Sequence, residues 1–188
     1  MIDDREGDTW ALVLAAGEGS RLRSLTTAAS GETIPKQFCS LYEGPSLLQE
    51  AIARARTVTG NSRICAVVAE QHRCWWKDSL ECLPAANVIV QPENRGTANG
   101  ILLPLLHIAE RDPEGCIVLL PSDHHVRNEP VLAASLARSL ARLRGSPGDT
   151  VLLGLQPEEA DPELGYIIPK DEAGGSSVQA IGRDRGAL

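Results

Sequence analysis

The chain has 188 residues, of which 43% are hydrophobic, and this is enough apolar sequence to bury one sizeable core. Its formal net charge of −7 argues against nonspecific binding to nucleic acid, which requires a basic surface. No apolar run approaches the roughly 20 residues of a membrane span. The acidic, polar start lacks the pattern of a signal peptide. We therefore expect a cytoplasmic protein that contacts no membrane, with residues 1–9 disordered.

The five cysteines are an odd number and form no C-x-x-C pair. Cys74 and Cys82 lie close to His72 in the sequence, but their spacing is not that of a structural zinc site. Reduced thiols are therefore expected, rather than disulfides or zinc ligands.

Short apolar, β-branched runs alternate with longer amphipathic ones along the chain. The expected strands are Trp10–Ala15, Arg63–Ala69, Asn87–Gln91, Cys116–Leu120 and Thr150–Gln156. The expected helices are Ser46–Val58, Gln71–Leu83, Gly96–Glu110 and Pro130–Arg144. This alternation predicts βαβ units in a single α/β domain over residues 1–188, with a mainly parallel sheet.

Three polar segments follow predicted strands: residues 16–23, 91–98 and 121–126. Parallel sheets place ligand sites beyond the carboxyl ends of their strands. We therefore expect these three segments, far apart in the sequence, to converge in space.

The first segment is a glycine turn in which backbone N–H groups can point at an anion, and Arg21 and Lys36 add positive charge. It is not a Walker A loop, because no Gly-Lys-Ser/Thr follows its glycines. It is not a dinucleotide-binding fingerprint either, because Leu22 stands where a small residue is needed and Glu70 is too distant. The pattern indicates a polyphosphate site of another kind.

The segments Leu14-Ala-Ala-Gly-Glu-Gly-Ser-Arg-Leu22 and Pro35-Lys-Gln-Phe38 resemble the N-terminal signature of the sugar-phosphate nucleotidylyltransferases. Glu93-Asn-Arg-Gly-Thr-Ala98 and Leu120-Pro-Ser-Asp-His124 resemble, more narrowly, mannose-1-phosphate guanylyltransferases. The resemblance covers about residues 10–167. It implies a Rossmann-like three-layer α/β/α nucleotidyltransferase fold, here incomplete at the C-terminus, whose N-terminal portion binds the nucleotide.

The resemblance also implies a reaction, in which GMP passes from GTP to mannose 1-phosphate and gives GDP-mannose and pyrophosphate. Arg21 would then bind the β- and γ-phosphates, and Lys36 would lie between the α-phosphate and the sugar phosphate. Asp123 would hold Mg²⁺. Asp123 could instead accept hydrogen bonds from amides ahead of the helix near residue 130.

Further residues gain expected roles from the same resemblance. The nucleotide is expected to contact Leu14, Ala15, Ala16, Gly17, Gly19, Ser20, Gln91, Asn94, Gly96 and Thr97. Gly165 and Tyr166 are expected beside the sugar, whereas His124 and His125 are expected to be structural because the attacking phosphate is already an anion.

The chain departs from the family after Ile167. The family continues with a Val-Glu-Lys-Pro strand that binds the sugar phosphate and a second aspartate that completes the metal site, and neither is found in the tail. A truncated chain is therefore expected. Two alternatives stay open: a catalytically incomplete nucleotide-binding or regulatory module, and another sugar nucleotidylyltransferase or a CTP-dependent cytidylyltransferase. The oligomeric state cannot be inferred from the sequence.

Overall fold

The computed structural model describes residues 8–18, 33–146, 148–155, 165–169 and 178–182. The chain divides into two compact units, Met1–Gly148 and Asp149–Leu188, and each is described by itself. The expectation of one domain over residues 1–188 stays a prediction, as does the disorder of residues 1–9, of which only 8 and 9 are described.

The first unit is built on a parallel four-stranded sheet in the order β3-β2-β1-β4. The strands are β1 (Thr9–Ala15), β2 (Ile64–Ala69), β3 (Val88–Gln91) and β4 (Cys116–Pro121). The side chains of β1 and β2 are almost all buried, as expected of central strands covered on both faces. These four strands confirm the predicted ones to within one residue at each end.

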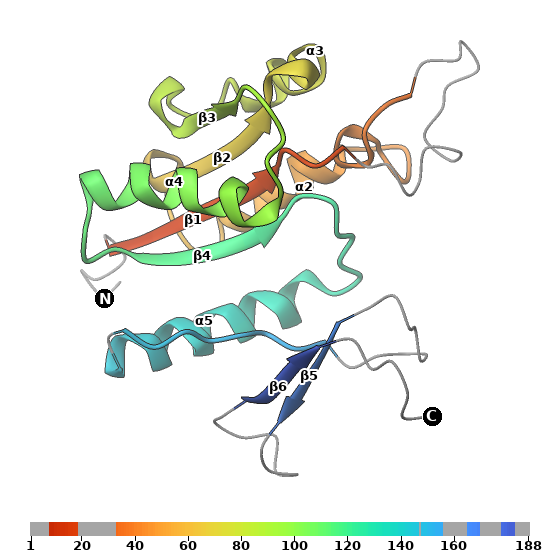
Figure 1. Cartoon of the computed structure of the whole chain (residues 1–188). Coiled ribbons are helices and arrows are strands. Elements are labelled where there is room, and N and C mark those ends of the chain that lie inside the picture. Colours follow the sequence, from red (N-terminus) through yellow and green to blue (C-terminus); the bar gives the residue numbers. More distant parts are fainter. Residues whose placement is uncertain (1–7, 19–32, 147, 156–164, 170–177, 183–188) are drawn as a thin grey trace. The chain divides into compact units, whose positions relative to one another are not determined.

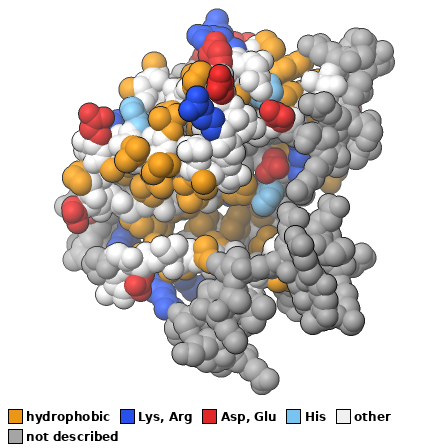
Figure 2. Space-filling model, viewed as in Figure 1, with side chains coloured by type: hydrophobic (Ala, Val, Ile, Leu, Met, Phe, Trp, Pro, Cys, Tyr) orange, Lys and Arg blue, Asp and Glu red, His pale blue; other side chains and the backbone are white. Residues whose placement is uncertain are grey.

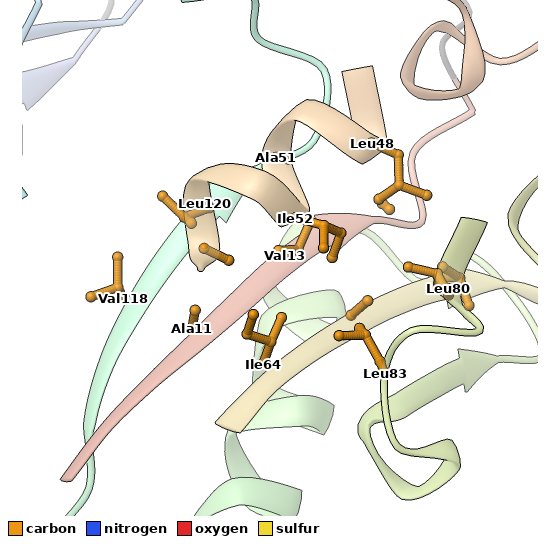
Figure 3. Close-up of a cluster of buried hydrophobic side chains, with 14 of the residues drawn as sticks. Ala11, Val13, Leu48, Ala51, Ile52, Ile64, Leu80, Leu83, Val118 and Leu120 are labelled. Carbon is orange, nitrogen blue, oxygen red and sulfur yellow. The ribbon is translucent and has the colours of Figure 1, made fainter. Parts of the chain in front are cut away.

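Helices cover both faces of the sheet (Figure 1). On one face lie α2 (Leu47–Ala55) and α5 (Glu129–Gly145), which pack against alternate residues of the strands. Figure 3 shows this core, where Leu48 and Ile52 of α2 lie above Val13 of β1. On the other face α4 (Thr97–Arg111) packs Ile108 against the sheet. The three-layer α/β/α fold is thereby confirmed.

Local sequence explains where these helices begin. Ser46 and Gln49 form a capping box at the start of α2, each side chain bonding to the backbone N–H of the other residue. The Asn128 side chain accepts a hydrogen bond from the Val131 N–H at the start of α5. Asn128, not Asp123, is therefore the N-cap residue of α5.

The outer side of α4 is apolar as well. Leu102, Leu103 and Leu106 are exposed there, and Figure 2 shows hydrophobic side chains gathered over this helix.

The single helix expected over Gln71–Leu83 is wrong. The segment forms a 3-10 turn (Glu70–His72), one turn of α-helix, α3 (Arg73–Trp76), and another 3-10 turn (Asp78–Leu80). Trp76 and Leu80 are nevertheless buried, so the apolar pattern correctly marked the residues that pack. Runs this short derive their order from such packing rather than from helix propensity.

The second unit contains an antiparallel pair, β5 (Tyr166–Pro169) and β6 (Val178–Gly182), which the sequence analysis did not foresee. The strand expected over Thr150–Gln156 is wrong, because residues 150–155 are irregular and residue 156 lies outside the described ranges. Leu152, Leu153 and Leu155 are exposed. A β-branched, apolar run forms a strand only where another strand offers hydrogen bonds to it. In the parts described, no helix is long and apolar enough to cross a membrane.

Candidate active site

A cavity of about 350 Å³ opens at the carboxyl ends of the parallel strands. All three polar segments that follow β1, β3 and β4 contribute to its wall, so the expected convergence is confirmed. The predicted site residues that line it are Leu14, Ala16, Gly17, Gln91, Asn94, Gly96, Thr97 and Asp123. Ala15 is buried, and neither Ala15 nor Lys36 lines the cavity, whereas Gly19, Ser20 and Arg21 lie outside the described residues.

The beginning of the glycine-rich loop is held by Gln37. Its side-chain amide donates hydrogen bonds to the carbonyl oxygens of Ala15, at 3.1 Å, and Gly17, at 2.7 Å. Gln37 itself is only 3% exposed and also lines the cavity. The 3-10 turn Lys36–Phe38 is therefore hydrogen-bonded directly to the start of the glycine-rich loop.

Gly17 has open space around it. Among the described residues, no atom lies within 4 Å of a Cβ atom built on Gly17, and its φ is not positive. Neither backbone strain nor packing against the described residues thus requires glycine here. Gly17 is also one of the residues that line the cavity.

The second segment enters the cavity between β3 and α4. The Asn94 carboxamide oxygen accepts a hydrogen bond from the Gly96 N–H at 3.0 Å. Gly96 has φ +83°, a conformation that favours glycine, and it ends the loop where α4 begins. The N-terminal end of a 15-residue helix, whose first N–H groups have no partner within the helix, therefore opens onto the cavity and favours negative charge there.

The third segment is attached to β1 by Ser122. Its hydroxyl donates to the Leu14 carbonyl oxygen at 2.6 Å, and its backbone N–H donates to the same oxygen at 3.2 Å. This attachment fixes the position of the next residue, Asp123, whose carboxylate lies 3.8 Å from the Lys36 ammonium. The two predicted catalytic residues that the structure describes are thus brought together.

The histidines around the site differ in their surroundings. His124 lies 3.7 Å from the Asp123 carboxylate, and His125 lies 3.6 Å from the Glu50 carboxylate. His72 packs edge-on against Phe38, with ring centroids 5.9 Å apart. Burial lowers the pKa of His72, although the nearby Glu18 carboxylate acts in the opposite direction. His72 is therefore a neutral ring beside the glycine-rich loop at neutral pH.

Among the residues described, no group of three or more His, Cys, Asp or Glu side chains is arranged to hold a metal ion. Asp123 is a hard oxygen donor that is half-exposed and faces the cavity, and such a group suits Mg²⁺. One carboxylate is not a complete metal site, so the other ligands would have to be phosphate oxygens and water.

Sequence reasoning missed three of the residues that build this cavity. Gln37, Ser122 and Gly100 all contribute to its wall. Gln37 and Ser122 lie next to Lys36 and Asp123 in the motifs that resemble the family. Their roles were missed because their hydrogen bonds reach β1 residues far away in the sequence. Gly100 lies one helical turn after Gly96 and beside the buried Gln91 side chain, since a Cβ atom built on it would lie 3.5 Å from the Gln91 amide nitrogen.

The predicted sugar-binding residues belong to the second unit. Gly165 precedes β5, and Tyr166 is its first residue. Their role beside the sugar stays a prediction.

The chain was compared with known proteins. The sequence profile of the family described as "Nucleotidyl transferase" matches residues 10–181. The xanthan biosynthesis protein XanB of Xanthomonas campestris is 30% identical over 175 residues, which are 92% of this chain and 36% of that protein. A mannose-1-phosphate guanylyltransferase of Escherichia coli is 30% identical over 158 residues, 83% of this chain and 32% of that enzyme.

A solved structure is similar as well. The protein described as mannose-1-phosphate geranyltransferase from Thermus thermophilus superposes with a TM-score of 0.75 at 27% identity, over 95% of this chain and 51% of that one. The chain thus spans about a third of its curated relatives' length and about half of this solved structure. Because the family profile extends over nearly the whole chain and the fold agrees with that of a solved relative, the chain belongs to the nucleotidyl transferase family.

Proposed function

We propose that the chain carries the nucleotide-binding part of an enzyme that transfers GMP from GTP to mannose 1-phosphate, giving GDP-mannose and pyrophosphate. The observation that carries this proposal is that the Lys36 ammonium lies 3.8 Å from Asp123, a residue that lines a cavity together with the start of the glycine-rich loop and the start of α4. The relatives named as mannose-1-phosphate guanylyltransferases support the choice of nucleotide and sugar.

The reaction needs little covalent work from the protein. An oxygen of the sugar phosphate forms a bond to the α-phosphorus of GTP, and the bond from that phosphorus to the bridging oxygen breaks. Pyrophosphate leaves with the electron pair. The protein must hold both reactants in line and neutralise the gathered negative charge.

The residues of the cavity suit these tasks. Lys36, 3.8 Å from Asp123, would supply a positive charge where the two phosphates meet, and the N–H groups at the start of the loop and of α4 would supply further donors. Asp123, together with phosphate oxygens, would hold Mg²⁺, which neutralises phosphate charge when bound. Arg21 would bind the leaving pyrophosphate. The loss of one such stabilising group raises the barrier by about 3 kcal/mol.

The test measures pyrophosphate release from GTP and mannose 1-phosphate in the presence of Mg²⁺, with ATP, CTP, UTP and dTTP in place of GTP as comparisons. Release that depends on both GTP and mannose 1-phosphate supports the proposal. Equal or faster release with CTP and a polyol phosphate would contradict it and favour a cytidylyltransferase.

A second function is favoured by one observation: among the described residues that line the cavity, Asp123 is the single carboxylate offered to a metal ion. The chain could bind the nucleotide without turning it over. Saturable GTP binding, seen as a rise in thermal stability with GTP concentration, together with no pyrophosphate release, would support this module over the enzyme.

A further inference from the structure

The three successive residues Lys36, Gln37 and Phe38 form one 3-10 turn and point to three different surroundings. Phe38 packs against the hydrophobic core and against His72. Gln37 is buried against the glycine-rich loop, and Lys36 reaches Asp123. The position of Lys36 is therefore determined by its two neighbours.

Gln37 also controls the direction of peptide groups in the loop. All peptide bonds described are trans, so each N–H points opposite to the carbonyl of the preceding residue. Gln37 holds the carbonyl groups of Ala15 and Gly17 on its own side. The N–H groups of Ala16 and Glu18 consequently point away from Gln37, both to the same side.

The direction of the first of these groups follows from the sheet. The Leu14 carbonyl receives the Ser122 N–H and so points toward the segment after β4. Successive carbonyl groups along a strand point to opposite sides. The Ala15 carbonyl thus points away from that segment, and the Ala16 N–H points toward it, where Asp123 lines the cavity.

We propose that Gln37 is a positioning residue for the triphosphate. Its amide keeps the loop in the shape that turns the Ala16 and Glu18 N–H groups toward the phosphates, and it holds Lys36 in register with them. This inference rests on the proposed function, since it assumes a nucleoside triphosphate in the cavity. It goes beyond that proposal because it assigns the loop's shape to a side chain outside the loop.

The experiment compares the affinities for GTP and GMP of the wild type, Gln37→Glu and Gln37→Met, measured by calorimetry. Glutamate has the same shape, but its carboxylate can only accept hydrogen bonds and would face the two carbonyl oxygens without a donor. Methionine has a similar length and also has no donor. Both variants should bind GTP about tenfold more weakly and GMP with little change, because a small displacement of groups that hold phosphate is costly. Gln49→Glu is the matched control, because glutamate can also accept the hydrogen bond from the Ser46 N–H at the exposed start of α2.

The outcomes separate this inference from the proposed function. If the wild type binds no nucleoside triphosphate, both fail. If the wild type binds GTP and the Gln37 variants bind it equally well, or lose GTP and GMP alike, only the role of Gln37 fails.

A second measurement needs no variant and so does not depend on the folding of one. Hydrogen exchange of the wild type should slow at the Ala16 and Glu18 amides when GTP is added. Unchanged exchange at both amides in the presence of bound GTP would overturn the proposal.

Discussion

The ammonium of Lys36 lies 3.8 Å from a carboxylate oxygen of Asp123, and this pair joins the turn after the glycine-rich loop to the segment after β4. The Lys36 side chain is 29% exposed and that of Asp123 is 47% exposed. An ion pair this accessible to water contributes about 0–1 kcal/mol to stability. The position of the Lys36–Asp123 pair is therefore better explained by a role in the reaction than by a contribution to folding.

The Lys36→Met variant is therefore expected to keep its stability and to lose its pyrophosphate-releasing activity. Its free energy of unfolding in urea should change by less than about 1 kcal/mol. The rate of pyrophosphate release from GTP and mannose 1-phosphate should fall about 100-fold or more, because a charge that stabilises the transition state is gone.

Lys77→Met is the matched control for this variant. Lys77 is exposed and does not line the cavity, so neither stability nor rate should change in the control. If the Lys36 variant released pyrophosphate as fast as the wild type, the catalytic role of Lys36 would be refuted.

The strands and their shared edge could be predicted from the sequence because both depend on local patterns. Apolar runs marked β1 to β4, and the rule for parallel sheets then placed Gly17, Gln91 and Asp123 at one end. The distance between Lys36 and Asp123 was not predictable from composition or periodicity. It depends on the Ser122 hydrogen bonds to β1.

The two elements that the sequence pattern predicted wrongly also depend on contacts that are not local. The segment Gln71–Leu83 has apolar residues at helical spacing, but it packs as separate short turns between β2 and β3. Residues 150–155 have strand composition, yet pairing depends on a neighbour that a local pattern does not reveal. Gln37 was overlooked as a site residue because Ala15 and Gly17, whose carbonyl groups it bonds, lie 22 and 20 positions before it, beyond the reach of a local pattern.

Gly17 offers a test of the cavity that does not depend on turnover. Because φ is not positive there and no atom of the described residues is near, Gly17→Ala should be tolerated by the fold. Its thermal stability should be unchanged or slightly higher, since alanine restricts the unfolded chain more than glycine does. Its affinity for GTP should nevertheless fall, because the added methyl group enters the cavity that the phosphates would occupy.

Gly60→Ala provides the comparison for Gly17. Gly60 also has no protein atom near its virtual Cβ, has φ −78°, and does not line the cavity. This variant should show the same effect on stability and unchanged GTP affinity. Equal affinity of the Gly17 variant and the wild type would exclude close approach of the nucleotide at this position.

At the opposite end of the sheet, Asp112 predicts a pH dependence of stability. The hydrogen bond from the Trp10 indole N–H and the one from Arg63 lower the pKa of Asp112, and the positive charge of Arg63 acts in the same direction. The folded state thus holds fewer protons than the unfolded state near the ordinary pKa of 3.8. The stability that this carboxylate provides is present above the unfolded pKa and is lost as the pH falls through the folded pKa.

The Asp112→Asn variant measures this contribution, because its amide oxygen can still accept from Trp10 but carries no charge. Between about pH 5 and 7 the variant should be less stable than the wild type by a constant amount, and the difference should shrink below about pH 4. Chemical denaturation at a series of pH values provides the comparison. A difference that stayed the same down to about pH 3 would mean that the charge of Asp112 contributes nothing.

The ion pair between Arg54 of α2 and Glu129 of α5 predicts an asymmetric loss of stability. The Arg54 guanidinium donates to both Glu129 carboxylate oxygens, at 2.6–3.2 Å. The Arg54 side chain is 2% exposed, whereas that of Glu129 is 44% exposed. Removal of Glu129 therefore leaves a buried positive charge without its partner, while removal of Arg54 leaves a carboxylate that water can reach.

Glu129→Ala should lower the free energy of unfolding by about 3 kcal/mol, and Arg54→Met should lower it by less. Arg56→Met, at an exposed arginine of the same region, should change it by no more than about 0.5 kcal/mol. Urea unfolding measures the free energy of unfolding of the three variants. A larger decrease for Arg54→Met than for Glu129→Ala would contradict the expected asymmetry of the α2–α5 ion pair.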